Sequence, residues 1–169
     1  YFLEGCSELK TIDLSSLIKL TEIGNDFLHG LYKITELDLS SLTLIRIGER
    51  FLIGCIALQN VQFNPNPTIT YVGEGFMSSC VNLENINLSC LGNITSIPSF
   101  FLYYCSTLKT IDFSNFSKVT KIGWKFLSET AITSADLSSW TELREIQGEF
   151  MMNCHEDRKS TRLNSSHTD

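Results

Sequence analysis

The stretch Phe101–Lys125, FLYYCSTLKTIDFSNFSKVTKIGWK, is one copy of a unit that recurs along almost the whole chain. Successive copies start 24 or 25 residues apart, and a fixed period of this length is typical of a solenoid, in which each copy stacks on the next. We therefore expect residues 1–154 to form one solenoid domain with six full copies and the start of a seventh. The copies begin at Phe2, Phe27, Phe51, Phe76, Phe101, Phe126 and Phe150.

Two hydrophobic periods follow one another within the unit. Between Phe101 and Leu108 the apolar residues fall at offsets 0, 1, 4 and 7, which matches about two turns of a helix. Next comes LxxIxF, in which Ile111 and Phe113 stand two apart, as in a strand with one buried face. The sequence therefore predicts an α/β solenoid with short parallel strands on one face and short helices on the other. An extended or 3₁₀ return leads to the next Phe.

Apolar residues at equivalent places in the copies form columns along the chain. A single copy can bury these side chains only against its neighbours, so we expect the copies to fold by stacking rather than alone. Three columns follow the predicted strands: Leu9, Ile34, Leu58, Leu83 and Leu108; Ile12, Leu37, Val61, Ile86 and Ile111; and Leu14, Leu39, Phe63, Leu88, Phe113 and Leu137.

The unit CxxLxxIxLxxLxxLxxIGxxFL resembles a leucine-rich repeat of the kind found in BspA-like surface proteins. The segment from Cys80 to Leu102, CVNLENINLSCLGNITSIPSFFL, shows the pattern well. One departure is that such repeats often carry Pro after the strand, whereas this chain mostly has Ser, as at Ser89 and Ser114. The resemblance implies a cell-surface or secreted location and attachment to host or matrix proteins.

The third copy departs most from the others, because it carries Pro65, Asn66 and Pro67 after the strand. Proline is tolerated there since the strand ladder has ended. Two interpretations are open: a locally rebuilt turn, or a loop that contacts a ligand. The sixth copy is one residue shorter before its strand and has Thr130 where other copies have Cys.

Composition narrows the classes of partner. The chain has 43% hydrophobic residues and a net charge of −6, and outside the tail 157–169 its basic residues stand singly, whereas phosphate binding needs clustered Lys and Arg. No apolar run approaches the roughly 18–20 residues that cross a bilayer. We therefore expect neither nucleic-acid binding nor membrane insertion. Because the chain opens on a repeat and without Met, we expect a fragment of a longer array, with any targeting signal upstream.

Residues 155–169 continue no repeat. Within them, DRKSTRLNSSH from Asp157 to His167 resembles the translation of a sequencing-library adapter, with a natural polar tail as the alternative. We therefore set the tail aside, as is done for other segments that are not part of the fold. Without 157–169 the remaining 10 basic and 17 acidic residues give a net charge of −7.

Five of the six cysteines share one column, and only Cys90 departs from it. Stacked parallel Cβ atoms would stay about 5 Å apart, whereas a disulfide needs about 3.8 Å. A spacing of 25 residues is no CxxC metal clip, and no His shares the column. We expect Cys55, Cys80 and Cys105 to be reduced, buried thiols, and we expect no metal, no cofactor and no cysteine nucleophile.

The outward positions of the predicted strands form the candidate binding face. Asp13 with Asp38, and Asp112 with Asp136, would be neighbouring like charges that repel by about 1 kcal/mol per pair. Selection for stability alone would not favour such pairs, and two origins are open: drift in the repeat array, or a contact surface. We expect the second, with a face that recognises basic or amide-rich groups. Its central column is Asp13, Asp38, Gln62, Asn87, Asp112 and Asp136; the column beside it is Thr11, Glu36, Asn60, Asn85, Thr110 and Ser134.

The sequence therefore favours a non-catalytic binding or adhesion module that contacts a protein or glycan through this face. An intracellular scaffold built on the same repeats is the alternative. An acid–base enzyme using paired carboxylates is disfavoured, since no copy differs from its neighbours in the concentrated way that an active site requires. The opposite side of the coils, around Tyr103 and Tyr104, is the alternative contact surface.

Overall fold

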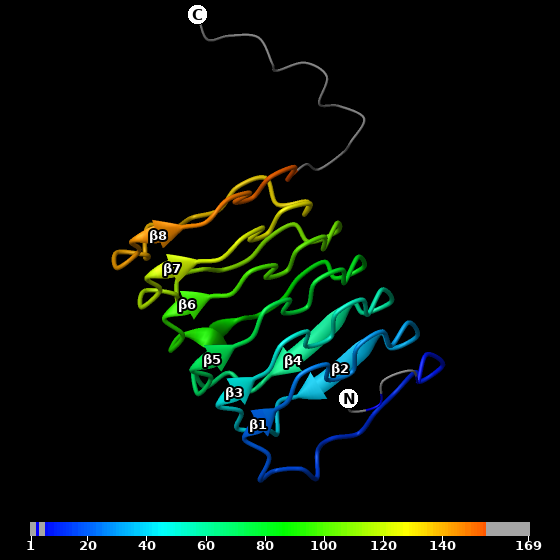
Figure 1. Cartoon of the computed structure of the whole chain (residues 1–169). Helices are drawn as coiled ribbons and strands as arrows, with labels where there is room; N and C mark the ends of the chain where they lie inside the picture. The colour runs from blue at the N-terminus through cyan, green and yellow to red at the C-terminus, as the bar shows by residue number, and fades with distance from the viewer. Residues whose placement is uncertain (1–2, 4–5, 155–169) are drawn as a thin grey trace, which may run out of the picture.

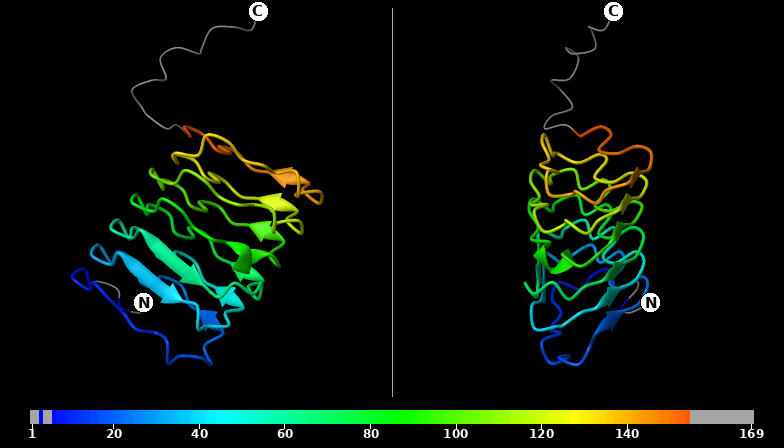
Figure 2. Two further views of the ribbon diagram at one scale, coloured as in Figure 1. Left: turned by 180° about the vertical axis from the view of Figure 1, so that it is seen from behind. Right: turned by 90° about the vertical axis from the view of Figure 1, so that its left-hand side faces the viewer.

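The computed structural model describes Leu3 and residues 6–154, so the adapter-like tail lies outside the described residues. The described chain is a stack of similar coils, one for each repeat (Figures 1 and 2). The blue N-terminal coil and the orange C-terminal coil lie at opposite ends of the stack. The solenoid of stacked copies expected from the sequence is therefore confirmed.

The first strand layer is the one expected from the LxxIxF segments. Strand β2 (Glu36–Leu39) pairs in parallel with β4 (Asn60–Phe63), with Asp38 opposite Gln62, and an isolated parallel bridge joins Asn85 to Thr110. Exposed and buried residues alternate along β2, so Leu37 and Leu39 face the core. This alternation places one face of the layer in solvent.

The second strand layer is made of the short segments that return to the next Phe. It contains two three-stranded parallel sheets: β1 (Glu22–Ile23) with β3 (Arg46–Ile47) and β5 (Tyr71–Val72), and β6 (Ser96–Ile97) with β7 (Lys121–Ile122) and β8 (Glu145–Ile146). The extended return is thus a set of strands in most coils. A 3₁₀ turn, η1 (Ser89–Leu91), follows the first layer in the fourth copy.

The predicted short helices are wrong. The described residues contain no α-helix, and where helices were expected every second residue has a positive φ, as at Arg50 (56°), Leu52 (55°) and Gly54 (71°). A right-handed helix needs consecutive residues with negative φ, so this alternation excludes it. The segment with these alternating φ angles, such as residues 50–54, is a tight corner of each coil. The apolar spacing of 0, 1, 4 and 7 arises from this corner and not from helical turns.

The stacking distance gives the physical reason for this corner. Neighbouring strands lie about 4.8 Å apart, whereas a helix with its side chains is about 10 Å wide, so helices could not stack at the spacing of the strands. The left-handed residues instead send their N–H groups to neighbouring coils: Leu52 donates to the Phe27 carbonyl (3.0 Å) and Leu102 to the Phe76 carbonyl (2.9 Å). Left-handed Leu costs about 1–2 kcal/mol, which full burial of Leu52 and Leu102 offsets at about 1.5–3 kcal/mol each.

A column of Phe rings runs through the core where each repeat starts. Ring centroids of Phe51 and Phe76 are 5.4 Å apart and those of Phe76 and Phe101 are 5.0 Å apart, with the rings stacked. In the shortened sixth copy Trp140 packs at 5.3 Å against Phe113, and its Nε1 donates to the Phe113 carbonyl. The aromatic column therefore continues to the last described coil, where Phe150 stacks on Phe126 at 5.4 Å.

A column of Gly at the end of the second strand layer brings the coils into close contact. A Cβ on Gly73 would lie 2.5 Å from the backbone nitrogen of Glu49, and a Cβ on Gly48 would lie 2.6 Å from the backbone of Gly24. Gly54 is a different case, because its φ is +71° but nothing lies within 4 Å of a Cβ built there. Gly73 and Gly48 therefore lack space for a Cβ, whereas Gly54 only requires a left-handed backbone.

Two alanine substitutions separate these two constraints. Gly54→Ala should lower the free energy of unfolding by about 1 kcal/mol, because the only penalty is the left-handed backbone. Gly73→Ala should cost about 3 kcal/mol or more, because two coils must move apart. Urea denaturation followed by circular dichroism measures both changes. Equal losses in the two variants would contradict the close approach at Gly73.

Candidate functional site

The structure places the twelve predicted residues of the binding face on the outer side of the first strand layer, and all twelve are exposed. Pairing of β2 with β4 sets Glu36 beside Asn60 and Asp38 beside Gln62. A cross-coil bond joins Thr110 Oγ1 to Asn85 Oδ1 at 3.3 Å. The parallel stacking thus aligns residues that are 24 or 25 positions apart in the sequence.

A hollow of about 670 Å³ lies in the middle of this face. Six of the twelve predicted residues line it, together with Pro65 of the irregular third copy. Four of these six residues carry amides, and an amide both donates and accepts hydrogen bonds. The six are Asn60, Gln62, Asn85, Asn87, Thr110 and Asp112; the other six, Asp13, Asp38, Asp136, Thr11, Glu36 and Ser134, lie elsewhere on the face.

The carboxylates of the central column have a structural role that the sequence reasoning missed. Each accepts a hydrogen bond from the backbone N–H two residues later: Asp38 from Ser40 at 2.8 Å and Asp112 from Ser114 at 2.8 Å. Asn87 accepts from Ser89 in the same way at 2.9 Å. These are Asx turns, which end the strand and start the following loop. The recurring Asp-x-Ser or Asn-x-Ser was the signal for them.

These hydrogen bonds also change the pKa of the carboxyl groups in the central column. They lower the pKa of Asp13 and Asp38 below the usual value, and the same is true of Asp112 and Asp136. For Asp38, the hydrogen bonds from the side chain and backbone of Ser40 come first, and repulsion from Asp13 is the smallest contribution. For Asp38, the hydrogen bonds from Ser40 therefore affect the pKa more than the repulsion from Asp13 does.

The Pro65–Pro67 segment of the third copy is a rebuilt turn. Its Asx turn is moved two residues along the chain, so that Asn64 Oδ1 accepts from the Asn66 N–H at 3.1 Å. The fourth copy supports the turn from the next coil, where Ser89 Oγ donates to the Pro65 carbonyl at 3.4 Å and Asn93 Nδ2 donates to the Pro67 carbonyl. Because Pro65 also borders the hollow, the rebuilt turn shapes one of its walls.

The cysteine column lies in the core. Cys55, Cys80 and Cys105 are free and fully buried, and each thiol donates to a carbonyl of the preceding coil, for example Cys105 to Met77 at 3.2 Å. Burial raises the pKa of Cys55 to about 11 and that of Cys105 to about 12, which leaves both as unreactive thiols at neutral pH.

The ends of the column differ from what the sequence predicts. Cys6 is exposed and Cys154 is only partly buried. Both belong to the terminal coils of the described stack, each of which is covered by a neighbouring coil on one side only. Cys90, the exception in the sequence, is buried near η1.

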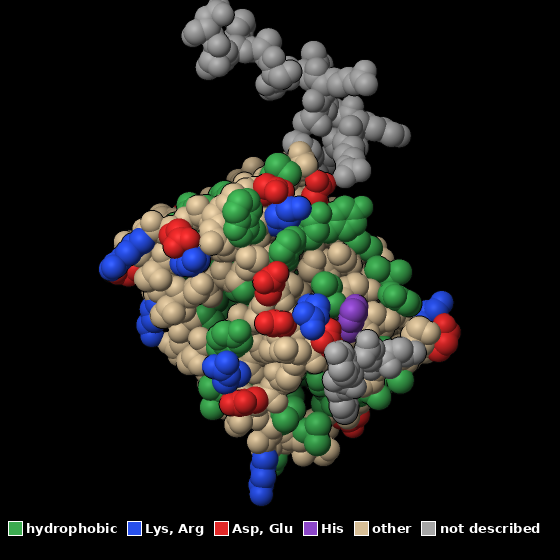
Figure 3. Space-filling view, in the orientation of Figure 1, with side chains coloured by type: hydrophobic (Ala, Val, Ile, Leu, Met, Phe, Trp, Pro, Cys, Tyr) green, Lys and Arg blue, Asp and Glu red, His purple; other side chains and the backbone are tan. Residues whose placement is uncertain are grey.

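Three other features would indicate a different kind of function: a metal site, a membrane span and a basic patch. They contain no group of three or more His, Cys, Asp and Glu placed to hold a metal ion. They also contain no helix of the length and hydropathy needed to cross a membrane. Acidic and basic side chains are interspersed on the face shown in Figure 3, without a basic patch.

Comparison with known families yields one match. A family model described as a BspA type leucine rich repeat region with 6 copies matches residues 1–89 and 21–156. Neither the curated proteins nor the solved structures contain a match.

Thiol labelling tests the cysteine column. In the native protein, Cys6 should react with a maleimide reagent first, because it is the exposed thiol, whereas Cys55, Cys80 and Cys105 should react only after denaturation. Mass spectrometry of alkylated peptides identifies the modified residues. Rapid native labelling of Cys80, or a disulfide between two of the buried residues, would contradict this packing.

The Asx turns predict a specific dependence of stability on pH. An Asp whose pKa is lower in the folded chain than in the unfolded chain stabilises the fold at every pH above the unfolded-state pKa. This contribution is lost as the pH falls through the folded-state pKa. The fourfold change of Asp13, Asp38, Asp112 and Asp136 to Asn keeps the turn acceptor, as natural Asn87 does, but removes the charge. We expect the variant to melt below the wild type at pH 7.

The difference in melting temperature should shrink as the pH falls below 3.8, the ordinary pKa of an Asp carboxyl, and should disappear once the pH is below the lowered folded-state pKa, where the wild-type carboxylates are neutral as well. The corresponding fourfold change to Ala removes the acceptor and should destabilise at every pH. Thermal melts between pH 7 and pH 2 measure both effects. A constant difference between wild type and the Asn variant would contradict the role of charge.

Proposed function

The chain belongs to the family of BspA-type leucine-rich-repeat proteins, and from that premise we propose that it is a non-catalytic protein-binding module. Its contact surface is the outward face of the first strand layer. Repeat families of this architecture suggest protein interaction because a stack of coils offers an extended and regular surface. The activity is recognition, and no catalytic step is assigned to any residue.

The hollow lined by Asn60, Gln62, Asn85 and Asn87 carries this proposal. Amide groups pair with backbone or side-chain groups of either polarity, so they suit a protein surface or an extended peptide. The carboxylates of Asp13 and Asp38 lie toward one end of the column, and Asp136 lies toward the other. The arrangement favours a partner that brings amides to the centre and Lys or Arg to the ends.

Adhesion at the cell surface is the biological setting that we propose. BspA-type repeats resemble those of surface proteins that attach to host or matrix proteins, so the ligand in this setting is a protein or a glycan that it carries. An intracellular scaffold is the alternative setting. The complete coding sequence distinguishes the two, because a signal peptide upstream of the repeats is required for export.

The corner of the coils supplies the competing contact surface. Phe100 and Tyr103 rings lie 5.7 Å apart, Tyr103 and Tyr104 lie 6.1 Å apart, and Lys125 Nζ is 5.3 Å from the Tyr103 centroid. Exposed aromatic side chains are common at protein interfaces, so this cluster must be tested beside the strand face.

Binding measurements with purified extracellular-matrix proteins test the proposal. The fourfold Asp→Asn variant should bind about tenfold more weakly than the wild type, with a smaller dependence on salt, because four exposed charge contacts are lost. Asn60→Ala with Gln62→Ala should weaken binding with little change in salt dependence. Surface plasmon resonance at two ionic strengths measures both.

Two controls make the result decisive. Glu22→Gln with Glu145→Gln neutralises carboxylates on the second strand layer and should leave binding unchanged. Tyr103→Ala with Tyr104→Ala should also leave it unchanged. If the Tyr variant alone loses binding, the corner is the contact surface and the strand-face proposal is wrong.

A further inference from the structure

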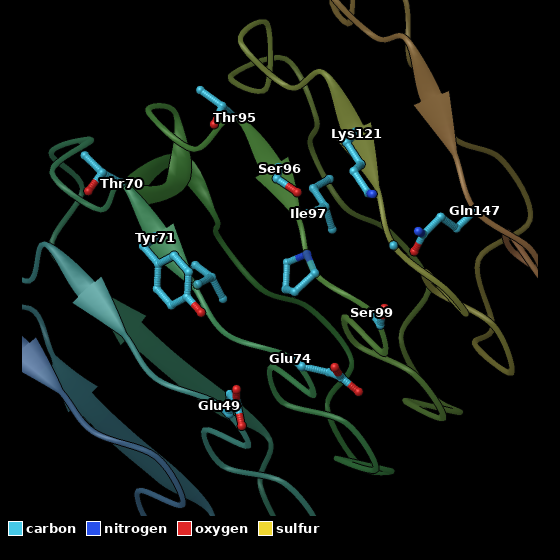
Figure 4. A pocket seen from close by; sticks show the side chains of 13 residues that line it. Glu49, Thr70, Tyr71, Glu74, Thr95, Ser96, Ile97, Ser99, Lys121 and Gln147 are labelled. Atoms are coloured by element: carbon cyan, nitrogen blue, oxygen red, sulfur yellow. The ribbon is translucent and has the colours of Figure 1, made fainter.

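A second hollow, of about 360 Å³, lies on the second strand layer between β5, β6 and β7 (Figure 4). None of the twelve predicted site residues lines it. Tyr71 of β5 and Lys121 of β7 border it, and Ser96 of β6 lies between them. This hollow is distinct from the strand face described above, and the two lie on different strand layers.

Pro98 is the reason for a break in the second layer at this point. In the other coils the residue after the strand donates its N–H to the preceding coil: Gly73 to the Ile47 carbonyl (2.9 Å) and Gly123 to the Ile97 carbonyl (2.9 Å). Pro98 has no N–H, so the equivalent bond to the Val72 carbonyl cannot form. Accordingly β5 and β6 belong to different sheets, and the hollow lies at their boundary.

In the coils on either side of Ser96, the equivalent residues are Tyr71 and Lys121. Each of these two side chains contacts the coil that lies away from Ser96. The Arg46 guanidinium lies 4.2 Å from the centroid of the Tyr71 ring, and Lys121 Nζ pairs with Glu145 at 2.9 Å. Ser96 is too short to fill the space between them. The hollow therefore has an aromatic wall whose position is set by Arg46, and Tyr71 remains 42% exposed.

The polar groups around the hollow are mainly uncharged. Hydroxyls come from Thr70, Thr95 and Ser96, and an amide comes from Gln147. Lys121 is the one cation among the lining residues, and Glu145 neutralises it. Glu49 and Glu74 lie together at one edge in Figure 4, so the hollow is unfavourable for an anionic ligand.

We propose that this hollow binds a neutral pyranose unit of a glycan. An exposed aromatic ring packs against the apolar C–H face of a sugar, and the hydroxyl, amide and carboxylate groups around it bond to the sugar hydroxyls. The volume lies near the lower end of the range for small-molecule sites, about 300–1,000 Å³, and suits a single ring better than a folded partner. The unpaired Val72 carbonyl adds a further acceptor at the break.

Saturation-transfer NMR tests the proposal with four probes: the methyl glycosides of glucose, galactose, mannose and N-acetylglucosamine. At least one should receive saturation from the wild-type protein. Ser96→Lys places a long side chain in the hollow and should abolish the signal. The fold accepts a long basic residue there, because Lys121 occupies the same position in the next coil and Arg46 occupies it two coils earlier.

Tyr71→Ala should weaken the affinity for that probe by about tenfold, because the stacking surface is lost. Tyr32→Ala is the matched control, since Tyr32 is 50% exposed and does not line the hollow, and it should bind as the wild type does. Pro98→Gly restores the N–H for the Val72 carbonyl, so the hollow should narrow and binding should fall. Circular dichroism confirms that each variant is folded.

Three results would overturn the proposal. The first is the absence of saturation transfer to all four glycosides from folded wild-type protein. The second is a signal that Ser96→Lys leaves intact. The third is binding of an oligolysine peptide that Ser96→Lys abolishes while no glycoside binds, which would assign the hollow to a basic peptide instead.

Discussion

The hydrogen bonds between coils are the interaction on which the rest of the structure depends. They hold neighbouring coils at the distance between strands, about 4.8 Å, and the chain must keep this distance on every side of the stack. The corner therefore uses alternating left-handed residues, whose N–H groups reach the next coil, and not a helix. Close contact at Gly48 and Gly73 follows from the same requirement. The stacked Phe column fills the interior at that spacing.

The same repetition controls the surface. Equivalent residues line up from coil to coil, so an outward side chain meets its counterpart, as Asp38 meets Gln62. Local Asx turns stabilise this alignment even where it brings like charges together, because the hydrogen bonds to Ser40 outweigh the repulsion from Asp13. A regular stack therefore presents exposed polar columns whose carboxylates also accept local hydrogen bonds.

Both hollows lie where proline interrupts the pattern. Pro65 borders the hollow on the first strand layer, where the third copy has a rebuilt turn, and Pro98 marks the break between the two sheets of the second layer. In a repeat array most coils bury or fill the same spaces, so a local concavity arises where one coil differs. The two hollows have different chemistry: amides supply most of the polar groups of the first, and hydroxyls with an aromatic ring line the second.

The sequence alone determined the repeat period, the stacking of the copies, the first strand layer and the burial of Cys55, Cys80 and Cys105. These depend on apolar side chains that recur at fixed intervals, and the intervals are visible when the copies are compared. The sequence also placed the strand face, since alternation decides which side chains point outward. Only the tertiary structure decided that the corner is not helical, that the Asp column forms Asx turns and that Pro98 opens a second hollow. The spacing of Phe101, Leu102, Cys105 and Leu108 fits either a helix or a tight corner, and the choice depends on hydrogen bonds to the coils on either side, 24 or 25 residues away.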